Sequence, residues 1–311
     1  MSSSWPREAR SRHATVDGQE LHYLDFDGPR SSPLVVCVHG LGGSALNFGA
    51  FGPLLTHRHR MLALDLPGHG RSEAGTASSR TGDTVDGLVR LVERFLLQVA
   101  ESPVILIGHS LGGVLTVLLA QRSPATVSSL ALLAPPVPHQ TRLPRDVRLM
   151  MKLALLRTPG VRQIVDRQLA RSSPAELVQK QLADATPHVS RVPPEAVDAS
   201  VIETADRLAS AGAAAARRLQ WNAILDTIAL LGRSAAWTAH LATVGQATIW
   251  MHGHDDRLVP IDDARALAAA RPGWTFRSRP GIGHLPHLED PSWVSHTLIE
   301  WLAGADDGSH D

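Results

Sequence analysis

Residues of the types that perform nucleophilic catalysis follow three short runs of this sequence that are predicted strands. Ser110 lies in GHSLG, residues 108–112, directly after VILI; Asp255 and Asp256 follow ATIWM, and His284 follows WTFRSRP. A serine hydroxyl becomes a nucleophile when a histidine takes its proton and a carboxylate orients that histidine. If each run is a buried strand, the three side chains meet at the carboxyl edge of one sheet, where α/β sheets bind ligands. The pattern predicts acyl transfer through a serine.

The sequence G-x-S-x-G around Ser110 predicts a sharp turn from a strand into a helix. Such a turn strains the backbone of the serine, so small residues are needed two positions before and after it. The surrounding run VILIGHSLGGVLTVLLA, residues 104–120, also resembles a membrane span. Its 17 residues, with a histidine and three glycines, fall short of the roughly 20 apolar residues that cross a bilayer. We interpret it as a buried strand followed by a buried helix.

A glycine-rich turn, HGLGGS at residues 39–44, follows the aliphatic run LVVCV. In that place a turn can direct backbone N–H groups at the negative charge that develops on an attacked carbonyl oxygen. The lysine of a phosphate-binding G-x-x-x-x-G-K-[ST] loop is missing. A second turn, DLPGHGRS at residues 65–72, follows the next aliphatic run, and we expect it to shape the site without reacting.

The elements that would position these residues alternate between strand and helix. Short aliphatic runs are typical of parallel strands buried on both faces, and helical segments separate them at 84–100 and 111–121. Residues 11–26 predict an antiparallel hairpin that turns at Asp17-Gly18. The fold class is therefore α/β, with a mostly parallel, doubly wound sheet. The predicted strands after the hairpin are residues 34–38, 60–66, 104–108, 130–134, 247–253 and 274–280.

This alternation stops at Pro135-Pro136 and resumes at residue 247. Helical segments broken by prolines fill the gap, which predicts an inserted, all-helical cap at residues 136–244. The expected organisation is a disordered N-terminus at 1–11, a core at 12–135 and 245–303, and a flexible tail at 304–311.

The motifs HGLGGS, DLPGHGRS, GHSLGG, GHDDRLVP and GIGHLPHLEDP together resemble those of the α/β-hydrolase fold superfamily with a helical cap, over roughly residues 12 to 303. The resemblance implies that Ser110 is the nucleophile and that His284 takes its proton and returns it to the leaving group. It also implies an oxyanion hole formed by the backbone N–H groups of Leu41 and Leu111.

For two roles the motifs contain neighbouring candidates. The resemblance favours Asp256 as the catalytic acid, because the family places this acid four residues before the proline of the V-P pair; Asp255 is the alternative. His287 competes with His284, but it lacks the preceding glycine and lies farther into the loop.

The serine at position 110, in the sharp turn between strand and helix, restricts the possible reactions. Epoxide hydrolases and haloalkane dehalogenases, which are similar in motif, need an aspartate there to form an alkyl-enzyme ester. The cap also lacks a tyrosine that could open an epoxide, since the only tyrosine is Tyr23. We expect cleavage of a carboxylic ester through an acyl-enzyme. The alternatives are a hydrolase of carbon–carbon bonds in ring-fission products, a cofactor-free haloperoxidase or perhydrolase, a thioesterase or acyltransferase, and a ligand-binding receptor.

We expect the cap to select the substrate. It contains 14 lysines and arginines against 9 acidic residues, and residues 142–157 concentrate this excess beside leucines and methionines. One interpretation is a lid that touches lipid and admits an acyl chain; the other is an amphipathic helix packed on the core. The candidate pocket residues are His109, Met150, Met151, Trp221 and Trp237.

Composition excludes several classes of partner and site. The 30 basic and 30 acidic residues balance, so no overall field attracts nucleic acid, and we expect a small ester or acyl compound as substrate. The single cysteine, Cys37, lies in a predicted strand and cannot form an intrachain disulfide. The N-terminal residues lack the apolar segment of a signal peptide, which predicts a cytoplasmic protein. The 16 histidines form no H-E-x-x-H motif, so we expect neither a metal nor another cofactor.

Overall fold

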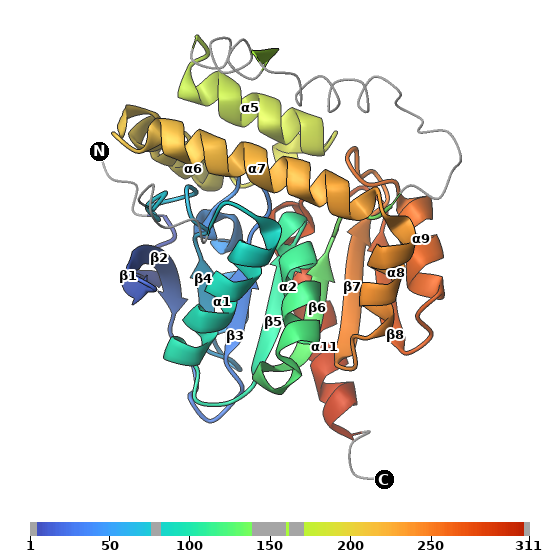
Figure 1. Ribbon diagram of the computed structural model, residues 1–311. Helices are drawn as coiled ribbons and strands as arrows, with labels where there is room; N and C mark the ends of the chain where they lie inside the picture. The colour runs from blue at the N-terminus through green and yellow to red at the C-terminus, as the bar shows by residue number, and fades with distance from the viewer. Residues whose placement is uncertain (1–4, 76–81, 139–159, 162–170, 308–311) are drawn as a thin grey trace.

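A computed structural model of the protein describes residues 5–75, 82–138, 160–161 and 171–307. Its centre is an eight-stranded sheet in the order β1-β2-β4-β3-β5-β6-β7-β8 (Figure 1). The first two strands pair antiparallel, and the six others run parallel to one another. The predicted fold class is confirmed. The strands are β1 (Ala9–Val16), β2 (Gln19–Phe26), β3 (Val35–Val38), β4 (Met61–Leu64), β5 (Val104–His109), β6 (Val127–Leu133), β7 (Ala247–Gly253) and β8 (Trp274–Arg279).

The N-terminal hairpin turns where the sequence predicted. Asp17 and Gly18 have positive φ angles of 52° and 77°, as a two-residue hairpin turn of the type that matches strand twist requires. The expected start of the core at residue 12 is wrong, because β1 begins at Ala9 and pairs with β2 along its whole length. Residues 9–11, assigned to a disordered N-terminus, have their backbone partners in that ladder.

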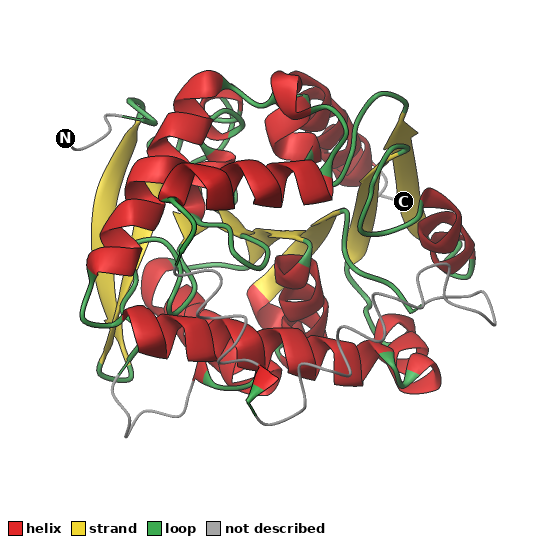
Figure 2. Ribbon diagram, turned by 90° about the horizontal axis from the view of Figure 1, so that it is seen from above, coloured by secondary structure: helices red, strands yellow, loops and turns green. Residues whose placement is uncertain are grey.

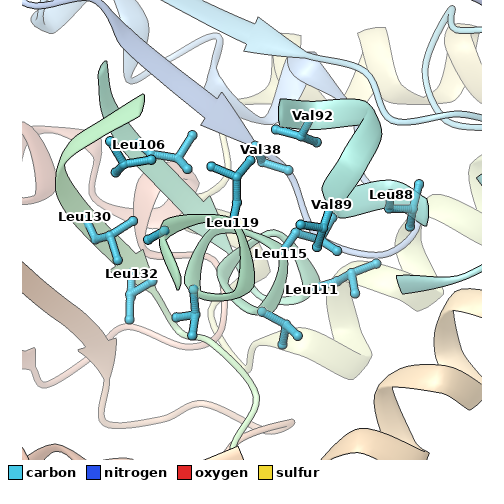
Figure 3. Packing of buried hydrophobic residues seen from close by; sticks show 14 of the residues in the cluster. Val38, Leu88, Val89, Val92, Leu106, Leu111, Leu115, Leu119, Leu130 and Leu132 are labelled. Atoms are coloured by element: carbon cyan, nitrogen blue, oxygen red, sulfur yellow. The ribbon is translucent and has the colours of Figure 1, made fainter. Parts of the chain in front are cut away.

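Helices cover both faces of the sheet (Figure 2). On one face lie α1 (Val85–Val99) and α2 (Leu111–Arg122). Nine of the 12 residues of α2 are buried, because it contacts the sheet, α1 and α8. Figure 3 shows Leu115 and Leu119 of α2 in one cluster with Val89. Burying each such leucine contributes about 1.5–3 kcal/mol, which makes α2 a rigid support for its first residue.

On the opposite face, α11 (Pro291–Asp307) packs Val294 and Leu298 against the sheet. This helix extends beyond residue 303, so the expected flexible tail at 304–311 is wrong for residues 304–307. Residues 308–311 lie outside the described part. The remaining elements on the core are α9 (Ile261–Ala269), α10 (Pro286–Glu289) and short 3-10 turns at Ala45–Phe48, Gly52–Leu54 and Pro124–Thr126.

The central strands are buried on both sides, as their aliphatic composition predicted. Every residue of β3 and β5 is buried. Cys37 on β3 has no exposed surface, and burial raises the pKa of its thiol. Within the described helices, none is long and apolar enough to cross a membrane.

Between β6 and β7 the described residues form helices and no strand. Helices α5, α6 and α7 lie over the carboxyl edge of the sheet (Figure 1). The predicted basic helix at 142–157, with Met150 and Met151, lies outside the described residues. The cap helices are α5 (Pro174–Ala185), α6 (Pro194–Ala209) and α7 (Ala213–Leu231), with a 3-10 turn at Val189–Arg191.

The last helix of the predicted cap, α8 (Ser234–Ala242), packs on the core instead. Trp237 and Leu241, one turn apart on α8, belong to the same buried cluster as α2. By its packing, the cap above the sheet edge therefore ends with α7, and the expected boundary at residue 244 includes one core helix.

Candidate active site

Ser110 occupies the turn between β5 and α2 with a strained backbone. Its φ of 50° and ψ of −120° lie outside the regions that ordinary residues adopt. A Cβ on Gly108 would lie 2.4 Å from the carbonyl oxygen of Gly112, and one on Gly112 would lie 2.1 Å from that of Val38. Side chains at these two positions would therefore displace the backbone, as the G-x-S-x-G pattern predicted.

His284 and Asp256 form a buried pair. His284 Nδ1 and Asp256 Oδ2 are 2.8 Å apart, and their side chains are 4% and 0% exposed. Because the carboxylate can only accept, Nδ1 carries the proton and Nε2 is left as the basic nitrogen. Within the described residues, no hydrogen bond joins Ser110 Oγ to His284. Hydrogen bonds between nucleophile and base often shorten only when substrate binds.

Asp256 is fixed from three further sides. Its Oδ1 accepts from the amides of Leu258 and Val259, each at 2.8 Å, and Oδ2 lies 3.3 Å from His252 Nε2. Trp250 Nε1 donates to His252 Nδ1, so the other ring nitrogen carries the proton. Sequence reasoning missed His252, although a histidine at the end of a buried strand, four residues before the acid, is a usable signal.

Asp255, the alternative acid, faces the cap. Its Oδ2 accepts from His188 Nε2 at 2.8 Å and from the amide of Gly281 at 3.1 Å. The hydrogen bond from His188 lowers the pKa of Asp255. The structure thus places Asp256, and not its neighbour, against His284.

His287, the alternative base, is a packing residue. It has no exposed surface, stacks on Phe48 with ring centroids 4.9 Å apart, and lies 4.5 Å from the His109 ring. Neither ring nitrogen has a hydrogen-bond partner among the described residues. Burial lowers the pKa of His287 to about 3, so the ring stays neutral.

His109 joins the nucleophile turn to the histidine loop. Its Nε2 donates to the carbonyl oxygen of His284 at 2.9 Å. Burial lowers the pKa of His109 well below its usual range, and the ring is neutral. His109 is 5% exposed and is not among the residues that line the 370 Å³ hollow described below; its hydrogen bond positions Ser110 relative to His284.

The glycine-rich turn after β3 lies directly against the nucleophile. A Cβ on Gly40 would lie 2.8 Å from Cβ of Ser110. His39 fixes this turn, because its Nδ1 donates to the carbonyl oxygen of Gly40 at 2.7 Å and its Nε2 accepts from the Leu66 amide at 3.0 Å. This histidine is part of the HGLGGS motif, but the motif alone predicted no role for it.

The two predicted oxyanion donors lie on either side of the serine. Leu41 follows Gly40, and Leu111 is the first residue of α2, where an amide has no acceptor within the helix. In the described chain neither amide donates a hydrogen bond. Both donors are thus available to a carbonyl oxygen near Ser110.

Asp65, at the end of β4, holds the surrounding loops together. It accepts from the amides of Ala45 and Arg71 at 2.6 and 2.9 Å and from His22 Nδ1 at 2.7 Å. Burial is the largest single influence and would raise the pKa of Asp65, but the hydrogen bonds from His22 and the Ala45 amide and the charges of His22 and His39 together lower it further than burial raises it. Both oxygens of this carboxylate therefore accept hydrogen bonds, which connect the hairpin, the segment after the glycine-rich turn and the loop that follows β4.

Glu289 organises the loop that carries His284, a role that sequence reasoning did not assign. Its carboxylate accepts from the amides of Gly283 and Leu285, at 2.8 and 3.0 Å, and from Thr186 Oγ1 at 2.7 Å. Thr186 terminates α5 of the cap, so one buried carboxylate links the cap to both neighbours of the catalytic histidine.

A hollow of about 370 Å³ opens between the cap helices and the catalytic loops. Gly42 of the glycine-rich turn and Leu258 of the acid loop contribute to its wall. Its other lining side chains come from α5, α6 and α7; Leu177, Val178 and Leu208 give it an aliphatic stretch of wall, and polar and charged side chains line the rest. The hollow therefore borders the loops on both sides of the reacting groups and suits an aliphatic chain.

The two tryptophans expected in the pocket lie elsewhere. Trp237 is 1% exposed and packs in the core beneath α8, so its assignment as a pocket wall is wrong. Trp221 is partly buried on α7 but does not line the 370 Å³ hollow. Helical spacing alone did not distinguish the core face from the pocket face of these helices.

Comparison with known proteins agrees with this architecture. The family model of the alpha/beta hydrolase fold matches residues 33–291. The uncharacterized hydrolase YugF of Bacillus subtilis is 27% identical over 295 residues, 94% of this chain and 97% of its own. RutD of Variovorax paradoxus is 30% identical over 287 residues, 91% of this chain and 96% of its own. The structure of the haloalkane dehalogenase DbeA from Bradyrhizobium elkani has a TM-score of 0.76 at 18% identity, covering 97% of this chain and all of that chain.

Proposed function

The chain belongs to the α/β-hydrolase fold family, and from this premise we propose that it is a serine hydrolase that cleaves a carboxylic ester through an acyl-enzyme. The observation that carries the proposal is the constellation at the sheet edge. A strained serine directly follows His109, which is hydrogen-bonded to the backbone of His284, and His284 Nδ1 is hydrogen-bonded to a buried carboxylate at 2.8 Å. This is the arrangement that activates a hydroxyl.

Acylation follows from these positions. Ser110 Oγ attacks the ester carbonyl carbon while His284 Nε2 takes the hydroxyl proton, and Asp256 stabilises the resulting imidazolium. The Leu41 and Leu111 amides donate to the carbonyl oxygen as it becomes negative. The tetrahedral intermediate then expels the alcohol, which takes the proton from His284, and the acyl group remains on Ser110.

Deacylation repeats the same steps with water. His284 removes a proton from water, which attacks the acyl carbon, and then returns a proton to Ser110 Oγ as the carboxylic acid leaves. The serine is what separates this chemistry from that of the dehalogenase neighbour in fold, whose class needs a carboxylate nucleophile.

The cap supports an acyl-chain-bearing substrate, because Leu177, Val178 and Leu208 form an aliphatic stretch of the hollow beside the catalytic loops. Transient contact with a lipid surface through residues 142–157 stays a prediction, since that segment lies outside the described part of the chain.

The test is hydrolysis of p-nitrophenyl esters of increasing acyl length, with thioesters and a vinylogous diketone in the same panel. We expect ester hydrolysis by the wild-type protein and a rate loss of about 10⁶-fold in Ser110→Ala. A fluorophosphonate should label Ser110, detected by peptide mass. The matched control is Ser102→Ala, which changes an exposed serine. Undiminished hydrolysis by Ser110→Ala would refute the assignment, and cleavage of only the diketone would replace it with carbon–carbon hydrolysis.

A further inference from the structure

Arg207 lies where the cap meets both loops around the active site. It is on the last turn of α6, and its side chain lines the 370 Å³ hollow that also touches Gly42 and Leu258. It lines a second hollow of about 410 Å³, between α6 and the loop Gly68–Gly75. A guanidinium in this place faces space that a ligand can occupy.

The charge of Arg207 has little compensation. Its one hydrogen bond among the described residues is a long one, from Nη2 to Thr204 Oγ1 at 3.4 Å, and it forms no salt bridge there. Burial lowers the pKa of Arg207, which shows that the surroundings disfavour its charge, although an arginine keeps its proton in proteins. A mostly buried cation without an anionic partner is destabilising unless a ligand supplies the anion.

The nearby acids do not neutralise this cation. Glu203 is one turn earlier on α6, and burial raises its pKa to about 8, so the neutral form dominates at neutral pH. Asp65 is ionised, but its oxygens already accept from two amides and from His22. The acid that lines the 370 Å³ hollow, Asp184, pairs with Lys180 at 2.6 Å. Glu73 and Asp206 line the second hollow, and within the described residues neither forms a salt bridge with Arg207.

The field of Arg207 reaches the catalytic loops. Burial is the main reason that the pKa values of His39 and His69 are lowered, and the positive charge of Arg207 lowers both further. His39 holds the glycine-rich turn against Ser110. Because Arg207 and Gly42 of the same turn line one hollow, an anion bound by Arg207 can belong to the substrate molecule whose carbonyl lies at Ser110.

We propose that Arg207 binds a carboxylate of the substrate, so that the preferred ester is a half-ester of an aliphatic dicarboxylic acid. The fork of the guanidinium matches a carboxylate in shape, and the aliphatic walls of the hollow take the methylenes between the two ends. This inference rests on the proposed ester hydrolysis for its catalytic readout.

The kinetic test compares mono-p-nitrophenyl esters of glutaric to suberic acid with the same esters whose free carboxyl is methylated. We expect the wild-type protein to favour the free carboxylate in kcat/KM by about 10- to 100-fold at the best length, as for a hydrogen-bonded ion. In Arg207→Gln that ratio should fall to about one, and in Arg207→Lys, which keeps the charge but loses the fork, it should be intermediate.

The matched control is Arg218→Gln, an exposed arginine on α7 whose Nη2 lies 3.9 Å from Asp83. It removes the same charge from the cap outside the hollow and should leave the ratio unchanged. A wild-type ratio near one, or a ratio that Arg207→Gln and Arg207→Lys both retain, would overturn the proposal. The second variant decides if the first does not fold.

A binding measurement separates this inference from the proposed function. Adipate is titrated calorimetrically into the Ser110→Ala protein with and without Arg207→Gln. Adipate binding that needs Arg207, together with a wild-type protein that hydrolyses no ester, would keep the carboxylate site and refute the esterase. Ester hydrolysis by the wild-type protein without adipate binding, and without a preference for the free carboxylate, would support the proposed esterase and refute the carboxylate site at Arg207.

Discussion

The core around Ser110 and the cap differ in whether their buried charged groups have hydrogen-bond partners. Around the triad, each buried carboxylate has its full set of donors: Asp256 accepts from two amides and a histidine, and Glu289 from two amides and a threonine. In the cap, Arg207 is mostly buried with one weak partner. The hydrogen bonds of the core are formed before substrate binds, whereas the cap contains a positive charge that an anionic group of the substrate can pair with.

The end of α5 is where the two regions meet. The carbonyl oxygen of Ala185 accepts from the amides of His284 and Arg257, at 3.3 and 3.4 Å, and Thr186 bonds Glu289. His188 bonds Asp255 on the acid loop. A shift of this helix end would therefore move both loops that carry the acid and the base.

The largest effect should come from the acid of the core. Asp256→Asn keeps the shape of the side chain but removes the charge that orients His284, and we expect kcat to fall about 10⁴-fold. Asp255→Asn, the matched change one residue away on the cap-facing side, should stay within about threefold of wild type, as for most surface changes. Steady-state ester hydrolysis measures both. A larger loss in Asp255→Asn would show that the core pair has been assigned to the wrong carboxylate.

An intermediate effect should come from the link between the two regions. Glu289→Gln replaces a charged acceptor of two loop amides, so we expect kcat to fall about 10- to 100-fold with KM little changed, because the loop positions His284 rather than substrate. Thr186→Val removes only the cap contact and should cost less.

Glu300→Gln, on the exposed side of α11, is the control for this pair. Chemical denaturation should show Glu289→Gln destabilised by about 1–3 kcal/mol. An unchanged kcat in a destabilised Glu289→Gln protein would reduce Glu289 to a purely structural residue.

The smallest effect should come from Glu203 in the cap. Its carboxyl faces Asp65, Arg71 and Arg207 and the hydroxyl of Ser44, and burial raises its pKa from 4.5 to about 8. Between these values the folded protein binds more protons than the unfolded chain, so the free energy of unfolding falls as pH rises. Glu203→Gln cannot titrate at this position. Its free energy of unfolding should therefore fall less over this pH range than that of the wild-type protein, by on the order of 1 kcal/mol.

Urea unfolding at about pH 5 and pH 8 measures this difference, and Glu195→Gln, exposed on the same helix, is the control. Parallel pH dependences of wild type and Glu203→Gln would mean that Glu203 is ionised at neutral pH. Arg207 would then have a resident partner, and the contrast between core and cap would weaken.

Local patterns were sufficient for most of the core. The strands that precede Ser110 and Asp256 form where their aliphatic runs lie, because a strand buried on both faces needs such residues throughout. The strand that precedes His284 is also where it was predicted, although it is only partly buried. The sharp turn at Ser110 is also determined by nearby residues. A side chain at Gly108 or Gly112 would collide with backbone atoms a few residues away or on the adjacent strand.

Helical spacing was insufficient for the cap. Trp237 and Trp221 both have helical surroundings, yet the first is buried against α2 and the second is partly exposed on α7. The boundary at residue 244 failed for the same reason, because α8 has an apolar face that either layer could bury. Which layer a helix joins depends on the surface available to it after the sheet has formed.

The sequence by itself determined the sheet, the strained turn and the residue types of the triad, because short-range sterics and hydrophobic alternation act within a few residues. Only the tertiary structure decided which of two adjacent aspartates turns toward His284 and that Thr186 reaches Glu289 across 103 positions. The same is true of Arg207, whose place beside the catalytic loops depends on how α6 lies across the sheet edge. Such contacts depend on the docking of whole helices, which no local pattern encodes.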